Sequence, residues 1–209
     1  MSDNEVKNRI LHTACEMFCE HGFSKATMEE LSQELGMSKK TLYQYFQSKE
    51  ELLGYVLQMM RDETDGILRQ HVEDDSVPFV VKLKRCLKAV STQINKQNKN
   101  FIADISKNAP VQWKEMEKWK REKVRGEFKN LIQHGVESGV FRTEINVDLL
   151  VEMYAVLMQS VWNPSVVYEL PMTSSQVHEM MTMIIFEGIF TDEARIKYHT
   201  TEAKHEQEK

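Results

Sequence analysis

The chain is poor in the residues that interrupt helices. Its 209 residues include 4 prolines and 8 glycines, so long helices are permitted throughout. No segment has roughly 18 uninterrupted apolar residues, which argues against a transmembrane helix. The N-terminus, MSDNEVKNR, is polar and lacks the apolar region of a signal peptide. We therefore expect a cytoplasmic protein in which long helices are possible, and its 41% hydrophobic content is enough for one or two domain cores.

Sequence motifs of enzyme chemistry are also missing. The chain has no glycine-rich phosphate loop, no catalytic serine motif and no metal-protease spacing. Cysteine is scarce, with 3 residues. Cys15 and Cys19 lie one helical turn apart and, with His12, could hold a thiophilic metal, but small buried cysteines in a packed helix are the ordinary case. We expect no enzyme, no cofactor and no metal site.

An excess of positive charge is absent as well. The net charge is −5, and residues 1–50 carry six basic and eight acidic side chains. This sum argues against nucleic acid, yet residues 38–49 contain three lysines and no acid. Phosphate contacts depend on local cations, helix N-termini and hydroxyls rather than on the charge of a whole domain. We therefore give the local placement more weight than the sum.

Residues 27–53 are the most informative stretch of the chain. They predict two short helices joined by a tight turn, followed by the start of a long helix. The boundaries are encoded by capping boxes at Thr27–Glu30 and Ser48–Glu51, a stop at Gly36 and an N-cap at Ser38. Leu42 and Phe46 would pack inward, because a helix of about eight residues forms only when it is docked. This is the arrangement of a helix-turn-helix, whose second helix enters the DNA major groove.

The same stretch resembles the TetR family of bacterial transcriptional regulators. The matching segments are VKNRILHTACEMFCEHGFSKATMEEL and GMSKKTLYQYFQSKEELL, and the likeness covers roughly residues 6–60. In the family the turn reads approximately Gly-Val-Ser and is followed by Thr-Leu-Tyr, an aromatic pair and Ser-Lys-Glu-Glu-Leu. Lys40 departs from this pattern, because the family often has a small residue there. The departure concerns the operator sequence and leaves the DNA-binding class intact.

The resemblance implies an all-α fold of about nine helices. It divides the chain into a helix-turn-helix DNA-binding domain at residues 1–50 and an effector-binding and dimerisation domain at 51–198. Residues 199–209 have almost no apolar content, so we expect a disordered tail there. Residues 147–162 and 176–190 are apolar on nearly every face, which favours burial in a homodimer seam of four helices. The alternative is that both helices lie centrally within one protomer.

Family roles carry over to particular positions of the predicted helix-turn-helix. Thr41, Tyr43 and Gln44 match positions that face base edges, where Gln44 could pair with adenine and the others could meet a thymine methyl. Positions that match phosphate contacts are Thr27, Lys39, Tyr45 and Lys49, and Lys40 could reach a guanine or a phosphate. Tyr43 and Tyr45 could alternatively serve in part as packing residues.

The resemblance also implies a cavity for a small-molecule effector. Methionine adapts to irregular shapes and tryptophan offers a large apolar area with one donor, so a hydrophobic or aromatic effector would suit a lining of these residues. The candidates are Trp113, Met116, Trp119, Phe128, Met153, Met158 and Trp162. The alternative for each is that it fills the core.

The sequence thus favours a one-component transcriptional regulator. We expect it to bind a near-palindromic double-stranded operator as a homodimer, usually as a repressor, and to be released by an effector. One alternative is a DNA-binding protein of the same fold with a protein-controlled or non-transcriptional role, which a body without a cavity would favour. Another is a helical enzyme that uses the motif for packing only.

Overall fold

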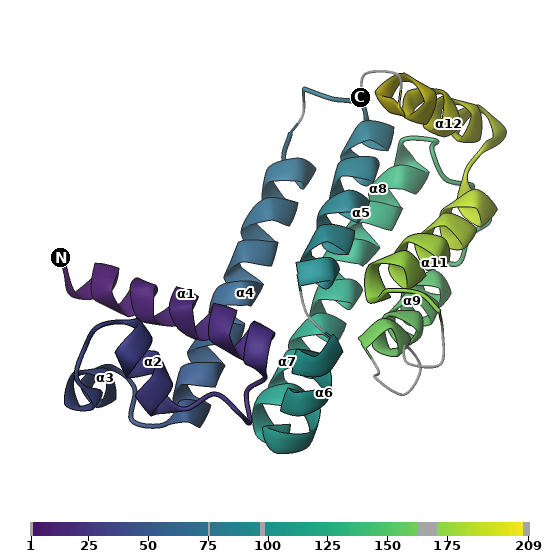
Figure 1. Ribbon diagram of the computed structural model, residues 1–209. Helices are drawn as coiled ribbons and strands as arrows, with labels where there is room; N and C mark the ends of the chain where they lie inside the picture. The colour runs from purple at the N-terminus through teal and green to yellow at the C-terminus, as the bar shows by residue number, and fades with distance from the viewer. Residues whose placement is uncertain (1, 75, 97–98, 163–170, 207–209) are drawn as a thin grey trace. The chain divides into compact units, whose positions relative to one another are not determined.

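The structure, a computed structural model, describes residues 2–74, 76–96, 99–162 and 171–206. These residues form helices joined by short connections, with one isolated β-bridge between Phe141 and Phe190 (Figure 1). The helices are α1 (Asp3–His21), α2 (Met28–Glu34), α3 (Lys39–Tyr45), α4 (Lys49–Val72), α5 (Phe79–Lys96), α6 (Lys99–Asn108), α7 (Pro110–Lys123), the π-helical turn η1 (Val124–Phe128), α8 (Lys129–Glu137), α9 (Val147–Trp162), α11 (Ser174–Ile189) and α12 (Asp192–Glu206). The expected all-α class is confirmed.

The chain divides into two compact units. The first unit consists of Met1–Gly66 and Lys96–Lys118, and the second unit consists of Ile67–Asn95 and Trp119–Lys209. Residues 51–66 and 96–118 therefore group with the predicted helix-turn-helix, although the sequence suggested a division near residue 50. No helix in the described ranges combines the length and the apolar character that crossing a bilayer requires.

The first unit is built around the buried faces of α1, α2 and α3 and the start of α4. Ile10 and Phe18 of α1, Leu31 of α2 and Leu42 of α3 are at most 1% exposed. The rings of Phe18 and Phe23 meet edge to face with centroids 5.4 Å apart, a favourable aromatic geometry. Because helices as short as α2 and α3 are unstable alone, this shared core is what orders them.

The helix boundaries in the first unit follow the capping residues that the sequence contains. The Thr27 hydroxyl accepts the backbone N–H of Glu30, whose carboxylate accepts the N–H of Thr27. Gly36 has φ +64°, a conformation that glycine adopts without a Cβ penalty. The Ser38 hydroxyl then accepts the N–H of Thr41 and begins α3. The predicted helix–turn–helix is confirmed.

The second unit has its own aromatic core. Phe141, Phe186 and Phe190 are at most 1% exposed, and they pack with apolar residues of α5, α8, α9 and α11. The Phe128 ring stacks on the ring of Tyr154 with centroids 3.9 Å apart. The core is therefore assembled from segments more than one hundred residues apart in the sequence, and no local pattern could have predicted its pairings.

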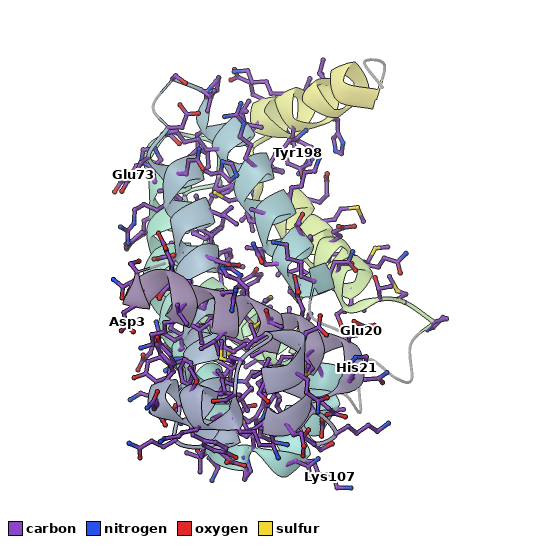
Figure 2. The ribbon with its side chains drawn as sticks, turned by 60° about the vertical axis from the view of Figure 1, so that its left-hand side comes forward. Asp3, Glu20, His21, Glu73, Lys107 and Tyr198 are labelled. Atoms are coloured by element: carbon purple, nitrogen blue, oxygen red, sulfur yellow. The ribbon has the colours of Figure 1, made fainter. Side chains whose placement is uncertain are left out.

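The C-terminus differs from the sequence-based expectation. Residues 199–206 were expected to be disordered, yet α12 continues through Glu206. The reason is that Ala194 is buried and Lys84 places its ammonium 4.1 Å from the ring centre of Tyr198 (labelled in Figure 2), so the first turns of α12 are anchored. Ala, Glu and Lys also have high helix propensity, so the helix continues although the segment as a whole is polar. The expected stop at Asn163–Pro164 and residues 207–209 lie outside the described residues.

Candidate nucleic-acid interface

Helix α3 presents a polar face because its other face is buried. Leu42 and Phe46 are both 0% exposed, which fixes the rotation of the helix. Lys40, Tyr43 and Gln44 consequently point outward, and Tyr43 is 46% exposed. Their spacing of three and four residues places them on one side of the helix. They have no side-chain partner within the described parts of the chain, so these groups are available to a ligand.

Two further candidates on α3 make exchangeable local contacts. The Thr41 and Ser38 hydroxyl oxygens lie 2.9 Å apart. The Lys39 ammonium lies 2.8 Å from a carboxylate oxygen of Glu29, and both side chains are more than half exposed. An exposed ion pair of this kind contributes little stability. Lys39 can therefore exchange this carboxylate for a phosphate.

Tyr45 connects the end of α3 to the start of α1. Its hydroxyl donates to the Asp3 carboxylate at 2.8 Å, and this hydrogen bond raises the pKa of Tyr45. Figure 2 shows Asp3 at the beginning of α1, with Glu20 and His21 at its other end. Tyr45 thus holds α1 and α3 together in addition to any contact with a phosphate.

The predicted role of Lys49 as a phosphate contact requires an outward ammonium, but this ammonium contacts the protein. Its ammonium donates to the carbonyl oxygens of Phe23 and Ala26, both at 2.9 Å, and lies 4.5 Å from the ring centre of Phe23. These carbonyls belong to the loop between α1 and α2 and lie outside the hydrogen-bond ladder of either helix. In this structure Lys49 therefore satisfies buried backbone groups and faces the protein.

Thr27 is exposed, but its hydroxyl is engaged in the cap of α2. It accepts the N–H of Glu30 at 3.1 Å and donates to the carboxylate of the same residue at 2.9 Å. A phosphate contact would have to displace the second of these bonds. The structure thus brings together five outward candidates on α3, Lys39, Lys40, Thr41, Tyr43 and Gln44, and gives Thr27, Tyr45 and Lys49 structural contacts.

Asp104 supports the same loop from α6, and the sequence gave no sign of this. One of its carboxylate oxygens accepts the N–H of Ser24 at 2.7 Å. The Cβ that a larger residue would add at Gly22, where φ is +90°, would lie 2.8 Å from this oxygen. Partial burial opposes ionisation of Asp104, but hydrogen bonds from Ser24 and Asn108 outweigh it and hold its pKa below the usual value. The partners are 80 residues apart, so only the fold reveals the contact.

The candidate effector residues are distributed over both units. Trp113 is half-buried and Met116 is 4% exposed in the first unit. In the second unit Trp119 is half-buried, and Phe128 and Met158 belong to the core or pack against it. Met153 is 51% exposed on α9, so it faces away from that core. The side chain of Trp162 lies outside the described residues.

A buried polar group in the second unit was not anticipated from the sequence. His178 of α11 is 0% exposed; its Nδ1 lies 2.8 Å from the Ser91 hydroxyl and its Nε2 lies 3.2 Å from the Tyr154 hydroxyl. Burial lowers the pKa of His178 to about 4, so the imidazole is neutral near pH 7. The three residues come from three helices, and both partners of His178 are more than 20 residues away in sequence, so no local pattern indicates this group.

The cysteines of α1 remain free thiols in the structure. Cys15 and Cys19 are half-buried. A hydrogen bond between their thiols raises the pKa of Cys15 and lowers the pKa of Cys19. His12 is exposed. Within the described ranges, no group of three His, Cys, Asp or Glu side chains is placed to hold a metal ion.

Comparison with known proteins agrees with the geometry of α2 and α3. Residues 10–56 match the family described as bacterial regulatory proteins, tetR family. The HTH-type transcriptional regulator YvaF of Bacillus subtilis is 28% identical over 188 residues, which are 90% of this chain and 97% of YvaF. The HTH-type transcriptional repressor DhaR of Mycobacterium sp. is 26% identical over 159 residues, 73% of this chain and 78% of DhaR.

Solved structures show the same fold. A transcriptional regulator from Cytophaga hutchinsonii superposes with a TM-score of 0.71 at 22% identity, covering 88% of this chain and 98% of that one. The curated relatives are named as transcriptional regulators, and none of the names given above is that of an enzyme. The matched segment contains α2, α3 and the exposed face described above. The helix-turn-helix segment of this chain therefore matches the TetR family of bacterial regulatory proteins, and over most of its length the chain is similar to helix-turn-helix transcriptional regulators.

Proposed function

We propose that this regulator represses transcription from a near-palindromic operator as a homodimer and is released by a small hydrophobic or aromatic effector. The observation that carries the proposal is the outward face of α3, where Lys40, Tyr43 and Gln44 have no partner within the described chain. A seven-residue helix that is held on one side by 0% exposed Leu42 and keeps its other side open is suited to enter a major groove.

Roles within this face follow from side-chain chemistry. Gln44 can donate to and accept from adenine through its amide, and Tyr43 and Thr41 offer apolar surface to a thymine methyl. Lys39 and Lys40 supply cations for phosphates. Tyr45, Thr27 and Lys49 contribute chiefly by fixing the position of α3 and of the preceding loop, since their polar atoms are already hydrogen-bonded.

Dimerisation is supported by the surface of the second unit. Helices α9 and α11 expose apolar side chains at helical spacing: Leu149, Met153, Val156 and Leu157 on α9, and Met180, Met183 and Ile184 on α11. Contiguous exposed apolar surface of this kind marks an interaction site. A second copy of the same surface would cover it in a two-fold arrangement. Two α3 helices about 34 Å apart would then read the two halves of a palindrome.

Release by an effector would act through the second unit. Its core contains Phe128, the adaptable Met158 packs against that core, and the hydrogen-bonded group around His178 includes Tyr154 of the same core. An effector that binds one conformation of the dimer more tightly lowers operator affinity if that conformation spaces the α3 helices wrongly. We assign residues 1–50 to DNA binding and 51–198 to dimerisation and effector binding.

Binding of the purified protein to a fluorescent duplex from its own upstream intergenic region, over a salt series, tests the proposal. We expect tight, salt-dependent binding that Tyr43→Ala weakens by about tenfold or more. Val111→Ala, a change at an exposed apolar residue of α7, serves as the matched control and should bind like the wild type. If the protein binds neither this duplex nor any fragment selected from a whole genome, the proposal is overturned.

A further inference from the structure

The buried polar group of the second unit is a chain of three neutral side chains. Ser91 of α5, His178 of α11 and Tyr154 of α9 are each at most 5% exposed. They are joined by two contacts, from Ser91 to Nδ1 and from Tyr154 to Nε2 of the imidazole. Because Ser91 is 87 residues from His178 and Tyr154 is 24 residues from it, the core fold brings these groups together.

The chain of contacts contains more donor hydrogens than it uses. Two hydroxyls and a neutral imidazole carry three polar hydrogens, whereas the group has two contacts. No further hydrogen bond of these three side chains exists within the described residues. One polar hydrogen is therefore left without an acceptor in a site that water does not reach freely, and buried donors are normally satisfied.

The two distances indicate which hydrogen is spare. The Tyr154–Nε2 distance of 3.2 Å suits an N–H donor better than a hydroxyl donor, and the Ser91–Nδ1 distance of 2.8 Å accommodates a hydroxyl donor. With the proton on Nε2, Ser91 donates to Nδ1 and Nε2 donates to the Tyr154 oxygen. The Tyr154 hydroxyl hydrogen then has no acceptor among the described groups.

The surroundings of Tyr154 are apolar. Its ring stacks on Phe128, and Leu87, Met158, Met181 and Ile185 pack against the same hydrophobic core. A buried carboxylate would need a cation or several donors, and none of these residues provides one. A neutral oxygen needs only one donor.

We propose that Tyr154, oriented by His178 and Ser91, is the polar anchor of the effector site and donates its hydrogen bond to a neutral acceptor oxygen, such as a ketone or ester carbonyl, on an otherwise apolar effector. This inference rests on the proposed function, because only a regulator has an effector. The preference for a neutral acceptor, however, can be measured on the isolated protein. It narrows the effector class from hydrophobic molecules in general to uncharged carbonyl compounds.

Binding of three matched probes to the purified full chain tests this anchor. The probes are cyclododecanone, cyclododecane and cyclododecanecarboxylate, and their affinities can be compared by tryptophan fluorescence and calorimetry. We expect the wild type to bind the ketone about tenfold more tightly than the hydrocarbon, in line with one hydrogen bond, and to bind the carboxylate most weakly. Tyr154→Phe should reduce the ketone preference to about twofold or less and leave hydrocarbon binding unchanged.

A matched control separates the anchor from general loss of a buried hydroxyl. Thr182 lies one turn from His178 on α11 and is also buried, but its hydroxyl donates to backbone carbonyls of its own helix. Thr182→Val should retain the ketone preference. Equal wild-type affinity for ketone and hydrocarbon, failure to bind the ketone, or preference for the carboxylate would each overturn the anchor.

The outcome of the DNA-binding experiment is independent of the outcome of the probe-binding experiment. Operator binding by Tyr154→Phe without any probe should match that of the wild type, because Tyr154 and α3 belong to different compact units. If the wild type shows the ketone preference but binds no DNA, the proposed repressor function falls and the anchor stands. If it binds DNA but shows no ketone preference, the anchor falls and the regulator stands.

Discussion

At the residue scale, Lys40 and Lys49 show how identical side chains acquire different tasks. Lys49 donates to carbonyls of the loop between α1 and α2, while Lys40 extends from α3 without a partner in the described chain. The sequence suggested a DNA contact for both, because neither a loop carbonyl nor its distance from a lysine is visible in a local pattern. Burial and hydrogen bonding separate them.

Replacing Lys49 by methionine should lower stability. Lys49→Met keeps most of the apolar stem but removes three hydrogen-bond donors, so the carbonyls of Phe23 and Ala26 lose their partner. We expect the free energy of unfolding to fall by about 1–3 kcal/mol, measured by urea denaturation. An unchanged midpoint with weakened DNA binding would instead assign Lys49 directly to a phosphate.

Replacing Lys40 by alanine should have the opposite profile. The exposed side chain contributes little to folding, so the unfolding midpoint should stay within error of the wild type. If Lys40 neutralises one phosphate, the slope of log affinity against log salt should become shallower by about one. An unchanged slope combined with altered base preference would place Lys40 on a guanine.

At the element scale, the sequence predicts helix boundaries, because these depend on interactions between residues close together in the chain. The caps Thr27 and Ser38 and the positive φ of Gly36 set the ends of α2 and α3, and all are readable within a few residues. The support of the α1–α2 loop by Asp104 and the contact of Ser91 with His178 span 80 and 87 residues. These contacts depend on tertiary packing, so they could not be predicted from spacing.

The apolar stripes of α9 and α11 predict a dimer that charge can disrupt. Val156→Glu places a carboxylate on a residue that is 60% exposed in one chain, so the monomer should fold normally. In the dimer the same carboxylate would be buried without a partner, and sedimentation should show monomers with at least tenfold weaker operator binding.

Ile196 provides the matched control for this change. It is 69% exposed on α12, outside the α9 and α11 stripes, and Ile196→Glu should leave the dimer intact. Monomers from Ile196→Glu, with dimers retained in Val156→Glu, would move the interface to α12.

The buried imidazole makes the second unit sensitive to acid. Burial lowers the pKa of His178 from 6.5 to about 4, so the unfolded chain binds the proton first as the pH falls. Stability should therefore decrease between pH 6.5 and 4, by about 3 kcal/mol over that window. Burial raises the pKa of Tyr154, which keeps it from titrating there. Denaturant midpoints for wild type and His178→Phe should converge toward low pH, and parallel curves would contradict this assignment.

At the scale of the whole molecule, the proposed function requires that two copies act together. One α3 helix would contribute few base contacts, and a second copy would double them at a spacing fixed by the dimer. The all-α class and the regulator family followed from residues near the N-terminus, whereas the composition of the second core and the helix that ends at Glu206 emerged only in three dimensions. Helix propensity and docking outweighed polarity in that last segment.

The most direct test of the account is a footprint on an operator fragment selected from genomic DNA, combined with the mass of the complex. We predict two protected half-sites about 10 base pairs apart, or a multiple of that spacing, with at least two protomers per duplex. Tyr43→Ala should abolish protection at the wild-type protein concentration. Protection of a single half-site by one protomer, or protection that Tyr43→Ala leaves unchanged, would contradict it.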